Sequence, residues 1–374
     1  MRHAALEFLA PCTTRRARRP ASGRLRVGFL SPDLNGHPVG RLVVGLIERL
    51  DHARFEVHAY DCNGPQVDGI WRRIRAASDR FRSIPVVDVR EVADAIRADE
   101  IDVLIDLTGF TGGRTCPSCA SACARSDQHL GYPARSAAPR STGSSPTPCI
   151  PDDLAHAAAA PRRALHCRRA TPRRRVAVAR THGLPEDAVV YAAMSAPYKI
   201  LPERFDAWMA ILRAVPASVL WMRTIGPVAV RRVLKRAESL GVDPRRLRFA
   251  SNEDVPRYLA RFRLADLFLD TSPFGSHTTV NDALSAGLPV LTQAGRTFAS
   301  RASASQVIAA GRPLAASLGS PDTAIALGLD RPRLRESSLR LRANRSLKPF
   351  FDPDAYARAF EAAIERAWKD TPAG

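Results

Sequence analysis

The sequence predicts an α/β protein with two Rossmann-like, doubly wound domains that face a central cleft, followed by a C-terminal helix. Strand and helix patterns alternate along each half of the chain. A length of 374 residues also exceeds one ordinary α/β core, so two domains are expected. Ligands of open α/β sheets bind beyond the carboxyl ends of the strands, and both halves would therefore present loops to the cleft.

The alternation of the first half begins at Leu25. Short apolar runs predict strands at Leu25–Leu30, Phe55–Tyr60, Phe81–Ile84 and Ile101–Leu107. Between them, helical periodicity predicts helices at Val39–Leu50, Gln66–Ser78 and Val89–Ala98. Strands that alternate with helices in this way form a parallel sheet with right-handed crossovers.

The second half repeats this pattern and ends in a further helix. Strands are expected at Val189–Met194, Ser218–Met222, Leu247–Ala250, Leu267–Leu269 and from Leu288. Helices are expected at Pro202–Val215, Val228–Leu240, Val255–Phe262, Thr278–Gly287 and Phe298–Ala310. The last helix has Asp352 as its cap and Pro353 in its first turn, and an apolar stripe that is typical of a core face: Tyr356, Phe360, Ile364 and Trp368.

Composition and charge exclude several classes of protein. No run approaches the roughly 20 apolar residues that cross a membrane, and the first residues lack the pattern of a secretory signal. We therefore expect a cytoplasmic protein with its seven cysteines reduced. The net charge of +19 would suit a polyanion. Aromatic residues do not interleave with the basic ones and no zinc-finger spacing occurs, so nucleic acid is not the expected partner.

The segment between the two halves, residues 114–182, has a different composition. It is poor in aliphatic residues and dense in arginine, proline and serine, and it holds five of the seven cysteines. Such a segment buries too little apolar surface to offset the entropy of ordering, so we expect low order, or a shifted reading frame. The pair Cys116 and Cys119 is a weak zinc motif without a second pair, and we expect no metal site.

A candidate anion site follows the strand Leu267–Leu269. Pro273 and Gly275 indicate a turn, and Ser276, His277, Thr278 and Thr279 then stand at a helix N-terminus. Backbone N–H groups and the helix dipole favour an anion there, and hydroxyl and imidazole groups beside them suit a diphosphate. Asp282, one turn into the helix, could accept hydrogen bonds from a ribose. The alternative is an ordinary strand–helix unit with a polar cap.

Several runs resemble the catalytic region of O-linked N-acetylglucosamine transferases, the SPINDLY-like bacterial members of glycosyltransferase family 41. In the second half they include Tyr198-Lys-Ile200, Leu264-Ala-Asp-Leu-Phe-Leu-Asp-Thr271, His277-Thr-Thr279, Ala286-Gly-Leu-Pro-Val-Leu-Thr292 and Gly295-Arg-Thr-Phe-Ala-Ser-Arg301. In the first half they are Leu25-Arg-Val-Gly-Phe-Leu-Ser-Pro-Asp33 with His37, and Asp102-Val-Leu-Ile-Asp-Leu-Thr-Gly109. The resemblance covers residues 24–113 and 183–370, and the tetratricopeptide repeats of the family are not found in this chain.

The resemblance implies a GT-B fold and a UDP-sugar donor. It implies inverting, metal-independent transfer of N-acetylglucosamine from UDP-N-acetylglucosamine to Ser or Thr hydroxyls of an acceptor protein, without a cofactor. Lys199 matches the lysine that neutralises the leaving diphosphate, and His37 matches the active-site histidine, a proposed base or acceptor contact. Tyr258 stands where the family has a histidine that stacks near the base, and with Arg261 it joins the expected nucleotide-sugar-binding residues.

The resemblance and the composition divide the chain into five parts: a disordered leader (1–22), an N-terminal catalytic half (23–113), the anomalous segment (114–182), a UDP-sugar-binding domain (183–345) and a C-terminal helix (346–374). Ala196 replaces the amide residue that the family carries three positions before the lysine. Two alternatives stay open: a donor with glucose or another hexose, and a catalytically impaired remnant that still binds UDP.

Overall fold

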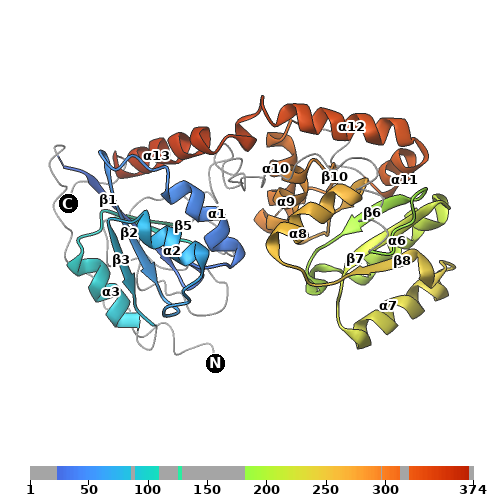
Figure 1. The fold of residues 1–374 in the computed structure, drawn as a ribbon, viewed down its shortest axis with the longest axis horizontal. Helices are drawn as coiled ribbons and strands as arrows, with labels where there is room; N and C mark the ends of the chain where they lie inside the picture. Colours follow the sequence, from blue (N-terminus) through green and yellow to red (C-terminus); the bar gives the residue numbers. More distant parts are fainter. Residues whose placement is uncertain are drawn as a thin grey trace. The chain divides into compact units, whose positions relative to one another are not determined.

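A computed structural model describes residues 23–85, 89–108, 125–128, 182–295, 297–311 and 320–369. These residues divide into two compact units (Figure 1). The first unit contains the described residues up to position 128 together with 353–369, and the second contains those from 182 to 352. Each unit is an α/β structure with its own parallel sheet, which confirms the two-domain fold class.

The sheet of the first unit has the order β3-β2-β1-β4-β5, and all its strand pairs are parallel. Its strands are β1 (Leu25–Ser31), β2 (Phe55–Asp61), β3 (Arg80–Ser83), β4 (Val103–Asp106) and β5 (Arg125–Gln128). Val27 on the central strand pairs with Val57 on one side and Val103 on the other, and all three are fully buried. β5 falls in the segment of unusual composition and was not predicted. The rest of that segment up to residue 181, and the leader 1–22, lie outside the described residues.

The helices of the first unit are α1 (Pro38–Ile47), α2 (Gly69–Ala76), α3 (Val89–Ala98) and α13 (Pro353–Lys369). α2 is shorter than the predicted Gln66–Ser78 because Asp68 caps it and accepts hydrogen bonds from the backbone N–H groups of Ile70 at 2.9 Å and Trp71 at 2.8 Å. The predicted apolar stripe of α13 is a core face: Phe360 is buried and stacks on Phe29, with 6.1 Å between ring centroids. α13 thus joins the first unit beside α1.

The sheet of the second unit has the order β10-β9-β6-β7-β8 and is again parallel throughout. Its strands are β6 (Val189–Ala193), β7 (Ser218–Arg223), β8 (Leu247–Ala250), β9 (Leu267–Leu269) and β10 (Val290–Leu291). β9 lies between β6 and β10, so the loop that leaves its carboxyl end starts within the sheet rather than at its edge. Loops in this position hold ligands in open α/β folds.

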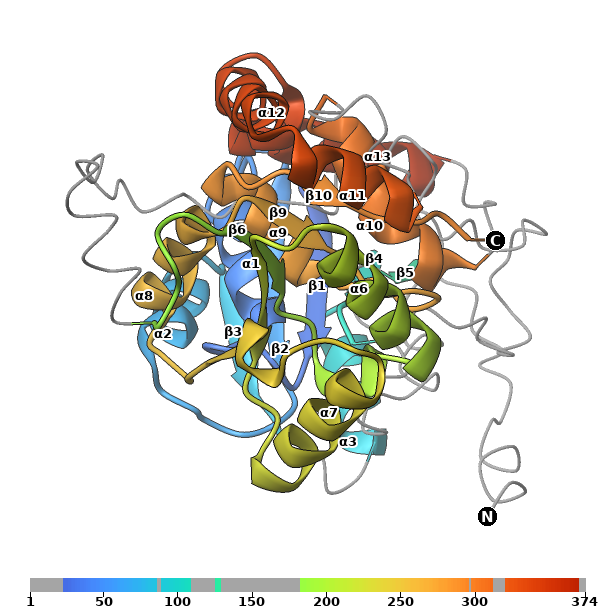
Figure 2. The same cartoon turned by 90° about the vertical axis from the view of Figure 1, so that its right-hand side faces the viewer.

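The helices of the second unit are α6 (Pro202–Ala214), α7 (Pro227–Ser239), α8 (Val255–Arg261), α9 (Thr278–Ala286), α10 (Phe298–Ala309), α11 (Pro321–Leu329) and α12 (Arg331–Asn344). α9 lies beside α8 and α10 (Figures 1 and 2). The apolar core holds residues of α6, α7 and α11, with Trp208 and Met209 among the most buried. α11 and α12 were not predicted. Among the described residues, no helix combines the length and apolar character needed to cross a bilayer.

Candidate functional site

The loop after β9 and the start of α9 form the centre of the candidate site. Asp270 follows the strand and is 4% exposed. One carboxylate oxygen accepts a hydrogen bond from the Ser276 backbone N–H at 2.8 Å, and the other accepts one from the Thr292 hydroxyl at 2.7 Å. The carboxylate therefore fastens the loop to the end of β10. α9 then runs to Ala286 and is closed by Gly287, the predicted end of this helix, whose φ of 83° is left-handed.

His277 occupies the cap position of α9 with an uncommon backbone conformation. Its φ is 47°, a value that a side-chain-bearing residue rarely adopts, and its side chain makes no capping hydrogen bond. Its Nε2 lies 2.8 Å from the carbonyl oxygen of Ala299 on α10, so that nitrogen carries the proton. Burial, with the nearby Lys199, lowers the pKa of His277 below its usual range. A neutral imidazole therefore stands at the helix start.

Lys199 reaches the same loop from the turn Pro197–Lys199, between β6 and α6. Its Nζ donates a hydrogen bond to the carbonyl oxygen of Gly275 at 2.9 Å and lies 4.1 Å from the ring centroid of Phe274. Burial lowers the pKa of Lys199 to about 8, although Asp270 opposes this shift. The structure thus brings together Lys199 and the helix start at His277, two parts that lie 78 positions apart in the sequence.

The other predicted residues at the helix start are buried to different degrees. Thr278 and Thr279 are half-buried in the first turn of α9. The Ser276 side chain is 3% exposed, and its hydroxyl is within hydrogen-bonding distance of Ser195 and lies 3.4 Å from that of Thr271. Asp282, one turn into α9, is also 3% exposed. Because the Ser276 backbone N–H donates to Asp270, both this N–H and the hydroxyl of Ser276 are engaged within the protein. The binding roles of all four residues stay predictions.

Tyr258 and Arg261 form a pair on α8. The Arg261 guanidinium carbon lies 4.5 Å from the Tyr258 ring centroid, and its Nη1 donates a hydrogen bond to the carbonyl oxygen of Ser251 at 3.0 Å. Arg261 is 3% exposed, and burial lowers its pKa. Arg261 therefore contacts both the loop after β8 and the ring of Tyr258. Tyr258 is the more accessible of the two residues.

His37 lies in the first unit, in the loop between β1 and α1, and caps α1. Its Nδ1 accepts a hydrogen bond from the Val39 N–H at 3.3 Å and lies 3.4 Å from a carboxylate oxygen of Asp33. The backbone N–H of His37 donates a hydrogen bond to the side-chain oxygen of Asn35 at 2.9 Å. Burial lowers the pKa of His37 and Arg41 adds to this shift, whereas Asp33 opposes it. The ring is thus held by local contacts at Nδ1.

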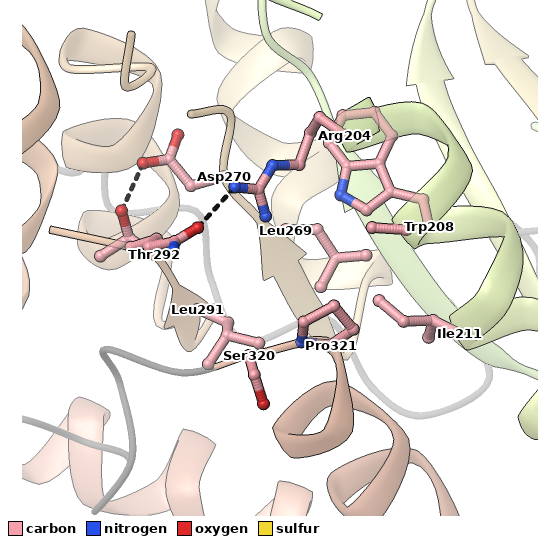
Figure 3. A pocket seen from close by; sticks show the side chains of 11 residues that line it. Arg204, Trp208, Ile211, Leu269, Asp270, Leu291, Thr292, Ser320 and Pro321 are labelled. Carbon is pink, nitrogen blue, oxygen red and sulfur yellow. Dashed lines mark hydrogen bonds between the residues drawn. The ribbon is translucent and has the colours of Figure 1, made fainter. Parts of the chain in front are cut away.

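A pocket adjoins the helix start and shares Asp270 with it (Figure 3). It is lined by one side of α6, the ends of β9 and β10, and the first residues of α11. Arg204 on α6 donates a hydrogen bond to the Gln293 side chain at 2.7 Å across it. Trp208, Ile211 and Pro321 supply apolar walls. Neither Arg204 nor Phe274 was predicted as a site residue, because no spacing rule marks a single residue in a helix turn or a loop.

Among the described residues, no group of three or more His, Cys, Asp or Glu side chains could hold a metal ion. Cys116 and Cys119, the weak zinc motif, lie outside those residues.

A family model and two relatives all relate this chain to glycosyltransferases. The model of the family named glycosyl transferase family 41 matches residues 7–141 and 152–360. The chain is 27% identical over 373 residues to the probable UDP-N-acetylglucosamine–peptide N-acetylglucosaminyltransferase SEC of Arabidopsis thaliana, covering 92% of this chain and 37% of that protein. It is 32% identical over 194 residues to the UDP-N-acetylglucosamine–peptide N-acetylglucosaminyltransferase of Caenorhabditis elegans, covering 51% of this chain and 17% of that protein. The chain therefore spans less than two fifths of the length of these relatives.

Solved structures show the same fold. A mutant O-GlcNAc transferase of Thermobaculum terrenum superposes with a TM-score of 0.74 at 27% identity, covering 93% of this chain and 68% of that one. A glycosyltransferase of Rickettsia africae has a TM-score of 0.58 at 10% identity, covering 93% of this chain and 100% of that one, and is similar in fold alone. With two parallel sheets, each flanked by helices, the chain has the GT-B fold that the sequence predicted.

Proposed function

The chain belongs to glycosyl transferase family 41, and from this premise we propose that it transfers N-acetylglucosamine from UDP-N-acetylglucosamine to Ser or Thr hydroxyls of proteins. The relatives that carry this activity in their names support the donor and the acceptor class. We expect a cytoplasmic location and a reaction without a cofactor, as the sequence predicted.

The proposed reaction is a single displacement that inverts the anomeric centre. The acceptor oxygen forms a bond to the sugar C1, the bond from C1 to the β-phosphate oxygen breaks, and its electron pair leaves with UDP. The acceptor proton passes to a base. Negative charge develops on the diphosphate as it leaves, so fixed positive groups at that point lower the barrier.

One observation carries the proposal: the Lys199 ammonium and the start of α9 meet at the same loop. Lys199 Nζ donates one hydrogen bond to the Gly275 carbonyl oxygen, and its two other N–H groups can donate to a phosphate oxygen. The first turn of α9 adds backbone N–H groups and the positive end of the helix dipole. In this arrangement protein groups can neutralise the leaving group, which is why we propose a metal-independent reaction.

We assign the base to His37. In the tautomer that carries its proton on Nδ1, the Nδ1–H group would point to the Asp33 carboxylate, 3.4 Å away. This tautomer could no longer accept the capping hydrogen bond from the Val39 N–H. Nε2 would then be the basic nitrogen that accepts the acceptor proton. The lowered pKa keeps this ring neutral, as a base requires.

The experiment is a UDP-release assay on the purified chain with UDP-N-acetylglucosamine, with and without a Ser/Thr peptide. Release that depends on the peptide, together with a mass gain of one N-acetylhexosamine on it, supports the proposal. Release from UDP-glucose alone would favour the hexose alternative. The impaired remnant, which Ala196 keeps open, predicts calorimetric binding of UDP without peptide-dependent release. Absence of both binding and release would contradict every form of the proposal.

A further inference from the structure

Phe274 contacts two polar side chains of the candidate site, those of Lys199 and His277. The Lys199 Nζ lies over its ring, 4.1 Å from the centroid. The His277 imidazole is stacked on the same ring at 5.0 Å between centroids and an interplanar angle of 23°. A single aromatic ring therefore touches Lys199, which the proposed mechanism places at the leaving diphosphate, and His277, the residue at which α9 begins.

Hydrogen bonds hold the backbone of this loop on either side of the Phe274 carbonyl group. The Thr271 hydroxyl donates a hydrogen bond to the Phe274 carbonyl oxygen at 2.7 Å. The next residue, Gly275, donates its N–H to the Ala299 carbonyl oxygen at 3.0 Å. That same carbonyl oxygen lies 2.8 Å from His277 Nε2. Two contacts with Ala299 thus join the loop to α10 just after Phe274, and the Thr271 hydroxyl holds the Phe274 carbonyl group within the loop.

Burial removes much of the water around the Lys199 ammonium, so protein groups must stabilise its charge instead. Burial is the main cause that lowers its pKa, and the groups that favour the charged form are few. They are the Asp270 carboxylate at the end of β9, the Gly275 carbonyl oxygen and the face of Phe274. His277 at the start of α9 would act against these groups, because a protonated imidazole would repel the ammonium. An aromatic face attracts a desolvated cation more strongly than an exposed one.

We propose that Phe274 is a positioning residue of the donor site, whose ring holds the Lys199 ammonium where it meets the diphosphate and packs on the His277 imidazole at the start of α9. This inference rests on the proposed function for its link to turnover. Its structural part, that the ring of Phe274 stabilises the charged form of Lys199, does not depend on any substrate.

The test compares Phe274→Leu, which keeps an apolar side chain but loses the aromatic face, with Phe274→Tyr, which keeps the face. The chain has four lysines, and Lys235, Lys348 and Lys369 are exposed. Trace acetylation with acetic anhydride between pH 6 and 11, quantified at each lysine by mass spectrometry, therefore reports the ionisation of Lys199 without donor, with three internal references. Substitution by trifluorophenylalanine, which weakens the ring quadrupole at nearly constant shape, serves as a second variant if the leucine variant unfolds.

We expect the titration midpoint of the Lys199 ammonium to fall by about one pH unit in Phe274→Leu and in the fluorinated variant. Loss of the cation–π contact disfavours the charged form. The tyrosine variant should keep the wild-type midpoint. In the UDP-release assay at pH 8, kcat/KM of the leucine variant should fall about tenfold, and that of the tyrosine variant should stay within about threefold.

Equal midpoints in folded wild type and folded leucine or fluorinated variants would overturn the inference. A shifted midpoint in a chain that releases no UDP would leave the positioning role of Phe274 intact and would contradict the proposed transfer instead. A shifted midpoint with unchanged kcat/KM at pH 8 would show that the ring does not serve turnover, and it too would overturn the proposal.

Discussion

Lys199 Nζ donates a hydrogen bond to the carbonyl oxygen of Gly275 at 2.9 Å, two residues before the start of α9 at His277. The lysine comes from the turn between β6 and α6, and the glycine from the loop after β9. β6 and β9 are neighbours in the sheet, so their carboxyl ends deliver both groups to the same edge. This contact joins the Lys199 ammonium to the loop that leads into α9, and the predictions below follow from it.

Removal of the Lys199 charge should reduce turnover much more than folding stability. Lys199→Ala is expected to lower kcat by about 100- to 1000-fold, the usual effect of losing one group that stabilises developing negative charge. Its unfolding temperature should stay close to that of the wild type, since the ammonium is desolvated in the folded chain. Lys235→Ala on α7 is the matched control because Lys235 is exposed. Equal kcat values for the two variants would remove Lys199 from the mechanism.

The lowered pKa of Lys199 predicts opposite pH trends for activity and stability. The charged lysine predominates below pH 8, so kcat/KM for the donor should fall as pH rises through about 8. The pKa of Lys199 in the folded chain lies below its usual value of 10.5, so the unfolded chain holds this proton more tightly. The Lys199 contribution to the free energy of unfolding should therefore increase between about pH 8 and 10.5. A pH–rate profile that stays flat to pH 10 would contradict the assignment.

His37 can be tested with a variant that keeps its structural role. Asn is among the best helix-capping residues, so His37→Asn should retain the cap of α1 and change the free energy of unfolding by only about 0.5 kcal/mol. It removes the titratable ring, and kcat should fall about 100-fold or more. His37→Ala should lose both the cap and the base, at an additional cost of about 1 kcal/mol in urea unfolding. Full activity of the asparagine variant would show that His37 is only a cap.

Asp270 should prove important for stability as well as for the site. Its carboxylate accepts hydrogen bonds from the Ser276 N–H and the Thr292 hydroxyl, and both donors lie in buried surroundings. Asp270→Ala leaves them unpaired and should lower the free energy of unfolding by about 2–4 kcal/mol. Asp270→Asn keeps one acceptor and should cost less. Urea denaturation of both variants checks this order, and a fully stable alanine variant would refute the fastening role of the carboxylate.

Sequence patterns predicted the elements whose apolar residues are dense and whose ends carry clear signals. β8 and β9 have the predicted bounds, and α9 ends at the left-handed Gly287 because few other residues adopt that conformation. Of the two helices that were not predicted, α11 and α12, the second was missed for a physical reason. α12 is rich in arginine and buries only two leucines, Leu334 and Leu341, so its helical periodicity is faint.

The candidate site was predictable in part. The strand–turn–helix pattern indicated the residues from Ser276 to Thr279, and the resemblance to the family indicated Lys199. The structure brings Lys199 to that helix start. The burial of Ser276 and Arg261, at 3% exposed each, depends on packing between elements far apart in the sequence. The contacts of Phe274 depend on the path of one loop, which no local pattern specifies. Tertiary contacts of this kind became visible only in the folded chain.

The central claim is that Lys199 and the start of α9 together hold the departing UDP, and a crystal structure of the chain with bound UDP tests it most directly. We predict a β-phosphate oxygen within hydrogen-bonding distance of Lys199 Nζ and of a backbone N–H in the first turn of α9. A well-ordered UDP whose diphosphate binds elsewhere, with Lys199 still on Gly275 alone, would contradict the account.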